Sequence, residues 1–435
     1  MKQFIYYLTP LFLLTAATLQ AQVPAPAPPQ EQPVVVRNVS IHTGTGEVIE
    51  DGAIAFIEGK LTFVGKDSDF EAGATRYDEL DGTGKHVYPG LILPNTILGL
   101  EEIGAVDATQ DQQEAGSFNP EVRSIVAYNT DSHLIPTLRS NGILLAQITP
   151  RGGLVSGTSS LVQTDAWNWE DAIVRSGDGI HINFPNKTLP PRWWLNETRA
   201  RKNPKFDQLI DALRKALREG KAYAENPAGE TNLKLEAMKG LYDSTKTAYL
   251  HTNYAEGMVQ GVQLLKEEGV KNIVLVGGAE ALYAKDFLVK ENIPLVLRNV
   301  HSLPFREDEP VNQPYSLPKL LTEAGVKLAL GYEGAMNARN LPFFAGTAAA
   351  FGLEKEKALQ LVTKNPAEML GVGDRLGTLE VSKAATLLIA SGDLFDMRSS
   401  QLEHAFIDGR HVSLDNKHKQ LYRKFRKKYM REEGK

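Results

Sequence analysis

Two side chains at the ends of predicted strands, His251 and Glu333, have the chemistry that a metal-assisted hydrolase needs. Imidazole and carboxylate groups donate lone pairs to a divalent metal, and a bound metal lowers the pKa of its water to about 7. His251 and Glu333 are therefore candidates for metal ligands, and Glu333 is also a candidate catalytic base. A catalytic zinc ion usually has three protein ligands, and the sequence does not identify the third.

Both residues also have structural interpretations. A histidine at a strand end often satisfies both ring nitrogens with hydrogen bonds, and Glu333 could instead form an ion pair with Arg339. His301 follows another predicted strand, but a histidine in a loop is usually solvated. The stretch 149–160, rich in glycine and hydroxyl groups, lacks the lysine and the spacing of a phosphate-binding loop. We interpret this stretch as a loop near the site.

The elements that would position these residues alternate along the second half of the chain. Apolar strand candidates at 247–251, 272–276, 293–297 and 326–331 are separated by stretches with helical apolar spacing. Parallel strands need such crossover connections, so the pattern predicts an α/β domain with a parallel sheet. Periodicity alone fits a closed (β/α)8 barrel and an open doubly wound sheet equally well.

Both ends of the chain have patterns typical of short β-strands. Runs at 34–36, 52–57 and 60–65 predict an antiparallel meander. Runs at 384–389 and 404–410 have the same character. We expect the second set to pair with the first.

The last segment predicts a basic helix. Leu421, Tyr422, Phe425 and Tyr429 recur at helical spacing among lysines and arginines. We expect this helix to dock on the domain with a solvated basic face. The alternative is a helix that binds a membrane surface.

Composition limits the classes of function. The 435 residues are 42% hydrophobic, which suffices for one large domain and one small one. A net charge of -5 and a pI near 6.1 give no reason to expect a nucleic-acid partner. The sequence has no cysteine, so disulfides and a thiol nucleophile are excluded, and no Gly-x-Ser-x-Gly turn points to a serine hydrolase.

The amino-terminal end has the pattern of an export signal. In Met1–Gln22, the positively charged Lys2 is followed by an apolar run, and the small residue Ala21 precedes the expected cleavage site. That run is short for a spanning helix, so no stable membrane span is expected after cleavage. Residues 23–33 are rich in proline and predict a solvated linker. We expect an exported, periplasmic protein.

Several segments together resemble the amidohydrolase superfamily, in particular its imidazolonepropionase-like branch. The run Val87-Tyr88-Pro89-Gly90-Leu91-Ile92 resembles the family's turn into the first barrel strand, and 358–368 with 375–380 resembles its closing segments. The resemblance implies a TIM barrel with a small β-sandwich built from both chain ends. The implied parts are a first sandwich portion, the barrel, a second sandwich portion and the basic helix, at 34–88, 89–373, 374–412 and 413–435.

The resemblance also implies where the metal ligands of such a barrel belong. The family carries His-x-His at the end of its first strand, and Asn95 and Ile97 stand at those positions here. His251 matches the histidine of the fifth strand, and Glu333 lies near the aspartate of the eighth. The resemblance is what assigns these two residues their roles as metal ligands, and Glu333 its role as the base. Gly277 and Gly278 follow the sixth strand, where many relatives have histidine. The resemblance thus implies a degenerate metal site, and its cofactor would be a divalent ion such as zinc.

The resemblance to the amidohydrolase superfamily leaves two possible functions. The resemblance implies an exported hydrolase that acts on carbon–nitrogen bonds, such as those of cyclic amides, with altered or reduced metal dependence. The alternative is a non-catalytic protein of the amidohydrolase fold that binds a ligand or pairs with an active relative. In both cases we expect a small molecule at the barrel mouth and no nucleic acid. A second copy of the chain or an active relative is the expected protein partner.

Overall fold

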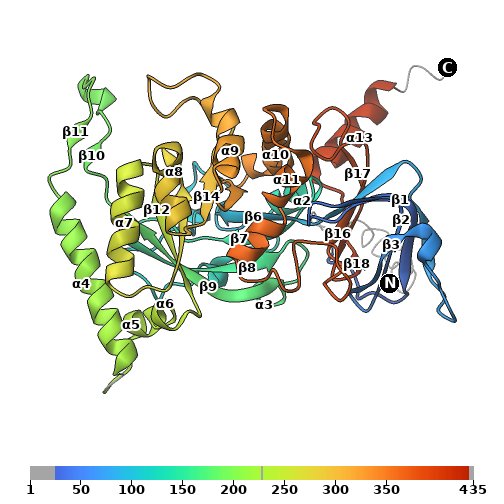
Figure 1. Ribbon diagram of the computed structural model, residues 1–435, viewed down its shortest axis with the longest axis horizontal. Coiled ribbons are helices and arrows are strands. Elements are labelled where there is room, and N and C mark those ends of the chain that lie inside the picture. Colours follow the sequence, from blue (N-terminus) through green and yellow to red (C-terminus); the bar gives the residue numbers. More distant parts are fainter. Residues whose placement is uncertain (1–24, 227–228, 431–435) are drawn as a thin grey trace, which may run out of the picture.

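The computed structural model describes residues 25–226 and 229–430, which form a barrel and a second β-sheet beside it (Figure 1). The export signal predicted at Met1–Gln22 lies outside the described residues. Within the described ranges, no helix combines the length and the apolar composition that a membrane span requires.

The barrel is an eight-stranded sheet in the order β6-β7-β8-β9-β12-β13-β14-β15. Its two outer strands, β15 and β6, lie next to each other, and Ile97 N donates to Glu333 O (3.0 Å) where they end. The sheet is therefore nearly closed, which confirms the predicted (β/α)8-like barrel over the open sheet. The strands are Leu91–Thr96 (β6), Ile143–Ile148 (β7), Val155–Gln163 (β8), Ile173–Asn183 (β9), Thr247–Thr252 (β12), Asn272–Gly277 (β13), Leu295–Arg298 (β14) and Leu328–Gly331 (β15).

One strand departs from the parallel pattern. β8 runs antiparallel to both β7 and β9, whereas the other neighbouring pairs of the sheet are parallel. The connection 149–154 between β7 and β8 is too short for a crossover, which needs a dozen or more residues. The chain therefore turns back at the mouth of the barrel, and Arg151 lies in that turn.

The second sheet combines strands from both ends of the chain, as predicted (Figure 1). Its order is β18-β17-β16-β5-β1-β2-β3, with β4 beside β1. β16 pairs antiparallel with β5, and this pairing joins the carboxy-terminal strands to the amino-terminal meander. The strands are Val34–His42 (β1), Val48–Ile57 (β2), Lys60–Lys66 (β3), Asp78–Asp81 (β4), Lys85–Pro89 (β5), Leu387–Ser391 (β16), Gln401–Ile407 (β17) and Arg410–His411 (β18).

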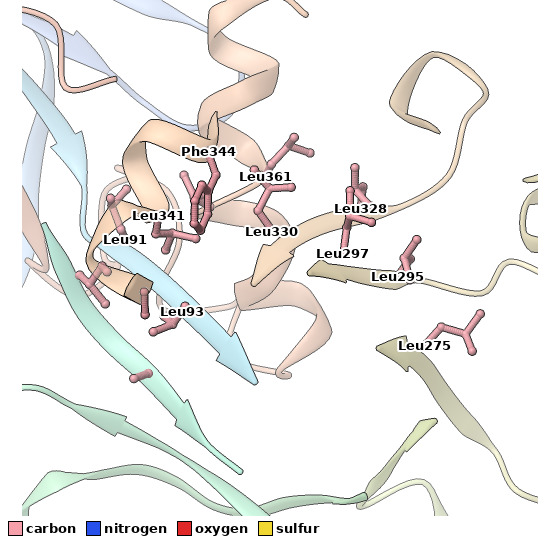
Figure 2. Packing of buried hydrophobic residues seen from close by; sticks show 14 of the residues in the cluster. Leu91, Leu93, Leu275, Leu295, Leu297, Leu328, Leu330, Leu341, Phe344 and Leu361 are labelled. Atoms are coloured by element: carbon pink, nitrogen blue, oxygen red, sulfur yellow. The ribbon is translucent and has the colours of Figure 1, made fainter. Parts of the chain in front are cut away.

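Helices cover the outside of the barrel and pack against its leucines (Figure 2). On β14, Leu295 and Leu297 belong to the cluster shared with the helices, whereas Val296 belongs to a separate cluster in which most residues come from the barrel strands. This alternation follows from strand geometry, and each fully buried leucine contributes roughly 1.5–3 kcal/mol. The principal helices are Leu134–Arg139 (α2), Phe206–Glu225 (α4), Leu233–Met238 (α5), Ala255–Glu267 (α7), Ala281–Lys290 (α8), Gln313–Glu323 (α9), Leu341–Ala350 (α10), Lys355–Gln360 (α11) and Lys364–Met369 (α12).

A polar layer lies inside the barrel. The buried carboxylate of Asp178 on β9 accepts hydrogen bonds from Tyr249 OH (2.7 Å), Ser159 Oγ (2.8 Å) and Gln147 Nε2 (2.6 Å). Burial raises the pKa of Asp178, and the three donors oppose that rise. Because these groups come from β7, β8, β9 and β12, they tie four strands together beneath the mouth.

Two terminal segments differ from the expected arrangement. Residues 25–33 contain no helix or strand, but they are not solvated throughout. Ala27 N donates to the buried carboxylate of Asp165 (2.8 Å), and Ala27 O accepts from Arg410 Nη1 (3.1 Å), so this segment is attached to the body of the protein. The carboxy-terminal helix α13 (Lys417–Tyr429) forms, but residues 421–430 are all exposed. Only its first turn is therefore attached to the domain.

Candidate functional site

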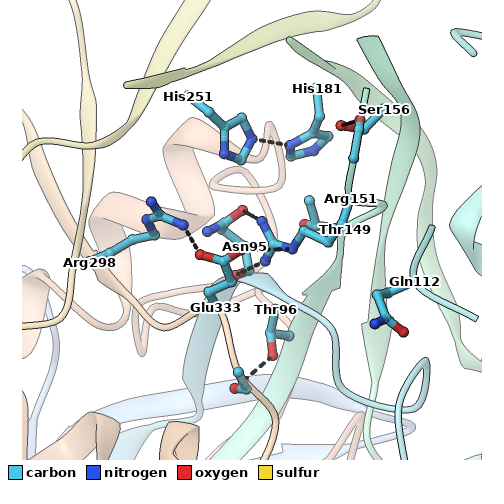
Figure 3. Close-up of polar contacts among 12 residues, drawn as sticks. Asn95, Thr96, Gln112, Thr149, Arg151, Ser156, His181, His251, Arg298 and Glu333 are labelled. Atoms are coloured by element: carbon cyan, nitrogen blue, oxygen red, sulfur yellow. Dashed lines mark hydrogen bonds and ion pairs between the residues drawn. The ribbon is translucent and has the colours of Figure 1, made fainter. Parts of the chain in front are cut away.

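Two histidines lie together at the mouth of the barrel (Figure 3). His181 on β9 and His251 on β12 share a hydrogen bond, with 2.8 Å between Nδ1 of His181 and Nε2 of His251. His181 is fully buried and stacks on Tyr249. Burial lowers the pKa of both imidazoles well below the ordinary histidine value, and the nearby positive charge of Arg151 lowers it further. Both rings are therefore neutral at pH 7.

Glu333 follows β15, and its carboxylate lies between two arginines (Figure 3). Arg298 at the end of β14 pairs with Glu333 Oε2, and Arg151 Nε lies 3.4 Å from Glu333 Oε1. Arg339, the partner considered from the sequence, instead has its Nη1 3.4 Å from Met336 Sδ. Glu333 is therefore an ion-pair partner at the mouth, but of arginines from two other strand ends.

Asn95 fixes the position of Arg151. Arg151 Nη1 donates to Asn95 Oδ1 (3.0 Å), and Arg151 Nη2 donates to Asn95 O (3.1 Å). Asn95 has φ +59°, a left-handed conformation that asparagine adopts more readily than most residues. Burial, and then the neighbouring Arg298, lower the pKa of Arg151 to about 9, so its guanidinium remains charged at neutral pH.

Only the first part of the glycine-rich stretch 149–160 is a loop at the mouth. Residues 149–154 connect β7 to β8, whereas residues 155–160, which were also expected to be a loop, begin strand β8. Gly152 and Gly153 both have positive φ, and a Cβ on them would lie 2.5 Å from Gln113 Cδ and 2.9 Å from Ser117 O, respectively. Glycine is therefore required where this loop passes under the segment that contains Gln113 and Ser117. Asn183 Nδ2 donates to Gly153 O (2.9 Å) and attaches the loop to the end of β9.

The mouth has more positive than negative charge. Two guanidinium groups share the single carboxylate of Glu333, and the two histidines are neutral. Four buried nitrogen atoms here have no hydrogen-bond partner within the described part of the chain: Asn95 Nδ2, Arg151 Nε, Arg298 Nε and His181 Nε2. Buried donors and charges without partners are costly, so the arrangement favours an anionic ligand that supplies acceptor oxygens.

These residues do not fit a divalent metal ion as they are arranged. Ile97 offers no lone pair, and Asn95 Oδ1 already accepts from Arg151. Both carboxylate oxygens of Glu333 face guanidinium groups, which would also repel a dication. Within residues 25–226 and 229–430, no three His, Cys, Asp or Glu side chains form a group suited to an ion. The ligand roles predicted for His251 and Glu333 would therefore require this ion-pair network to rearrange.

A cavity of about 310 Å³ opens beside Arg298, under the connection between β14 and α9. Leu297, Phe305 and Leu317 give the cavity apolar walls, and Asn253 contributes a polar group at its edge. A pocket with apolar walls and a few polar groups suits a small organic ligand.

Sequence reasoning missed part of the site. His181 and Arg298 were not singled out, and Arg151 was treated only as part of a loop. A usable signal was the alternation of strand residues, because Val296 and Arg298 are two residues apart and point to the same side of β14. His301, which was considered, does not join the group: its ring packs edge-on against Phe344, with 4.8 Å between the centroids.

Protonation of the two histidines provides a test. The pKa values of both histidines are lowered in the folded state, so below about pH 6.5 the unfolded chain binds protons that the folded chain does not. The free energy of unfolding should therefore decrease as the pH is lowered through this range. The slope approaches about 1.4 kcal/mol per pH unit for each histidine. We expect urea unfolding to show a weaker pH dependence in His181→Asn/His251→Asn. The exposed His418→Asn is the control; equal slopes in wild type and double variant would contradict a neutral pair.

Comparisons with known proteins found a family model, a curated relative and solved structures that are similar to this chain. The amidohydrolase family model matches residues 200–412. A 5-methylthioadenosine/S-adenosylhomocysteine deaminase of Syntrophobacter fumaroxidans is 32% identical over 126 residues, a match that covers 23% of this chain and only 28% of the deaminase.

An amidohydrolase from Thermotoga maritima MSB8 has the same fold with a TM-score of 0.75 and 24% identity, covering 87% of this chain and 99% of that one. A zinc-bound adenosine deaminase from Xanthomonas campestris, 15% identical, matches with a TM-score of 0.53 over 92% of this chain and 99% of its own. Residues 200–412 thus match the amidohydrolase family, and the described structure has the fold of a known amidohydrolase.

Proposed function

We propose that this chain is an exported hydrolase that cleaves a carbon–nitrogen bond in a small anionic amide, with reduced dependence on metal. One observation carries the proposal: Arg151 and Arg298 hold Glu333 directly beside the neutral pair His181 and His251. The family match supports hydrolysis of carbon–nitrogen bonds, because the relatives include deaminases.

Arg151 and Arg298 would bind the anionic group of the substrate. A carboxylate on the substrate would balance the excess positive charge of Arg151 and Arg298 and accept from the unpaired Arg298 Nε and Asn95 Nδ2. Charge-assisted hydrogen bonds of this type are about twice as strong as neutral ones. The cavity beside Arg298 would hold the apolar part of the substrate.

The histidines supply a base. A general base must be unprotonated before it accepts a proton, and burial keeps His251 neutral. His251 is only partly buried, whereas His181 lies beneath it and orients its ring through the hydrogen bond. In the proposed reaction His251 removes a proton from water, the oxygen of that water bonds to the carbonyl carbon, and the carbon–nitrogen bond breaks. The proton then passes to the departing amine.

The alternative function is ligand binding without catalysis. Its specific support is that Asn95 and Ile97 occupy the positions where the family has two metal-binding histidines, so the usual way to activate water is weakened. The anionic ligand and the cavity would be the same. Product formation separates the two functions.

Hydrolysis assays test the proposal with matched substrates. We expect turnover of a cyclic amide with a carboxylate, such as 5-oxoproline, or of an N-acyl amino acid, and much slower turnover of counterparts without the carboxylate. Arg298→Gln should raise KM for the charged substrate by about 10- to 100-fold, because a hydrogen bond to a charged group is lost. Addition of a chelator should leave most of the activity, because the proposed reaction has reduced dependence on metal.

The control for this variant is Arg339→Gln, which removes a guanidinium that does not contact Glu333. Binding of the charged amides without any product would favour the non-catalytic alternative. Equal rates for charged and uncharged amides would refute anion recognition, and complete loss of activity with chelator would refute reduced metal dependence.

Export rests on the pattern of Met1–Gln22 alone. It predicts that the protein isolated from the periplasm of its host begins near residue 23, and amino-terminal sequencing measures this directly. An intact Met1 on protein from the cytoplasm would contradict export.

A further inference from the structure

The carboxy-terminal helix α13 projects from the body of the protein (Figure 1). None of its side chains is buried, although Leu421, Tyr422, Phe425 and Tyr429 are large and apolar or aromatic. Tyr422 is 63% exposed and Tyr429 is 69% exposed, values far above those of aromatic side chains in the core. A helix with this composition has an apolar face without a partner within the described residues.

The apolar side chains lie on one side of α13. At 3.6 residues per turn, Leu421, Tyr422, Phe425 and Tyr429 fall within an arc of about 100°. Lysines and arginines occupy both flanks of that arc and the opposite side, for example Lys424 and Arg426. The helix therefore combines a narrow aromatic stripe with a dense positive charge.

The charge of α13 contrasts with the rest of the protein. The helix contains Lys417, Lys419, Arg423, Lys424, Arg426, Lys427 and Lys428 and no acidic residue. The whole chain nevertheless has a net charge of -5. The remainder is therefore acidic, and positive charge is concentrated on this one exposed helix.

We propose that α13 binds the surface of an anionic membrane and lies in the plane of the headgroups. Amphipathic helices with basic flanks and aromatic or leucine side chains on the apolar face bind there, because the cations attract anionic lipids while the rings enter the interface. At 13 residues the helix is about 20 Å long, so it cannot span the hydrocarbon core.

The start of α13 is fixed to the barrel, so binding would hold the enzyme at the membrane. Asn416 Oδ1 caps the helix by accepting from Lys419 N (2.9 Å), and Asn416 Nδ2 donates to Ser140 Oγ (2.7 Å) just after α2. Arg423 pairs with Asp415 in the segment that leads into the helix. These contacts attach the first turn, while the turns with Phe425 and Tyr429 extend outward.

Sedimentation of the full-length chain with lipid vesicles tests the proposal. We expect binding to vesicles of phosphatidylcholine with about one-third phosphatidylglycerol, and little binding to phosphatidylcholine alone. Lys424→Glu/Lys427→Glu should weaken the binding by at least about tenfold, since each cation near the surface contributes about fivefold. Phe425→Ser/Tyr429→Ser should also weaken it, because the rings enter the interface.

The control variant is Lys215→Glu/Lys357→Glu, which makes the same change in net charge at exposed positions on α4 and α11. It should bind vesicles like the wild type. Equal loss in this control would refute a role for α13, and unchanged binding in the serine variant would refute insertion of the rings. Tighter α13-dependent binding to DNA than to anionic vesicles would overturn the lipid assignment in favour of a general polyanion site.

Discussion

The contact between Glu333 and two arginines organises the mouth of this barrel. Arg298 ends β14, Arg151 lies in the turn from β7 to β8, and Glu333 follows β15, so the network joins three separate parts of the barrel rim. The side chains of Arg151 and Arg298 are only 13% and 15% exposed, whereas that of Glu333 is 43% exposed, so loss of Glu333 would leave two largely buried charges without their partner. This contact therefore stabilises the arrangement of the mouth.

The reversed strand β8 makes this network possible. Because the β7–β8 connection is a short turn, Arg151 stays at the mouth, where Asn95 holds it through two hydrogen bonds. Asn95 stands where the resemblance places a metal-binding histidine. The two guanidinium groups thus bring positive charge to the mouth, and guanidinium groups recognise carboxylates by geometry as well as by charge.

The sequence predicted the fold more completely than the site. Alternating strands and helices, together with β-rich chain ends, indicated the barrel and the mixed sheet because those patterns reflect burial. The direction of β8 was not predictable, since apolar spacing is the same for parallel and antiparallel strands. The place of His251 at a strand end was predicted, but its partner His181 was not. Contacts such as Arg298 with Glu333, 35 residues apart, arise only when the barrel closes.

Measurement of the metal content tests most directly the central claim that the mouth, as it is arranged, does not bind a divalent ion. The full-length protein would be incubated with excess zinc, separated from free ion and analysed by mass spectrometry for bound metal, beside His251→Ala. Because both oxygens of Glu333 face guanidinium groups, the account predicts far less than one zinc ion per chain in both proteins. About one ion per chain in the wild type, lost in His251→Ala, would contradict the account, because that result requires a coordinating site centred on this histidine.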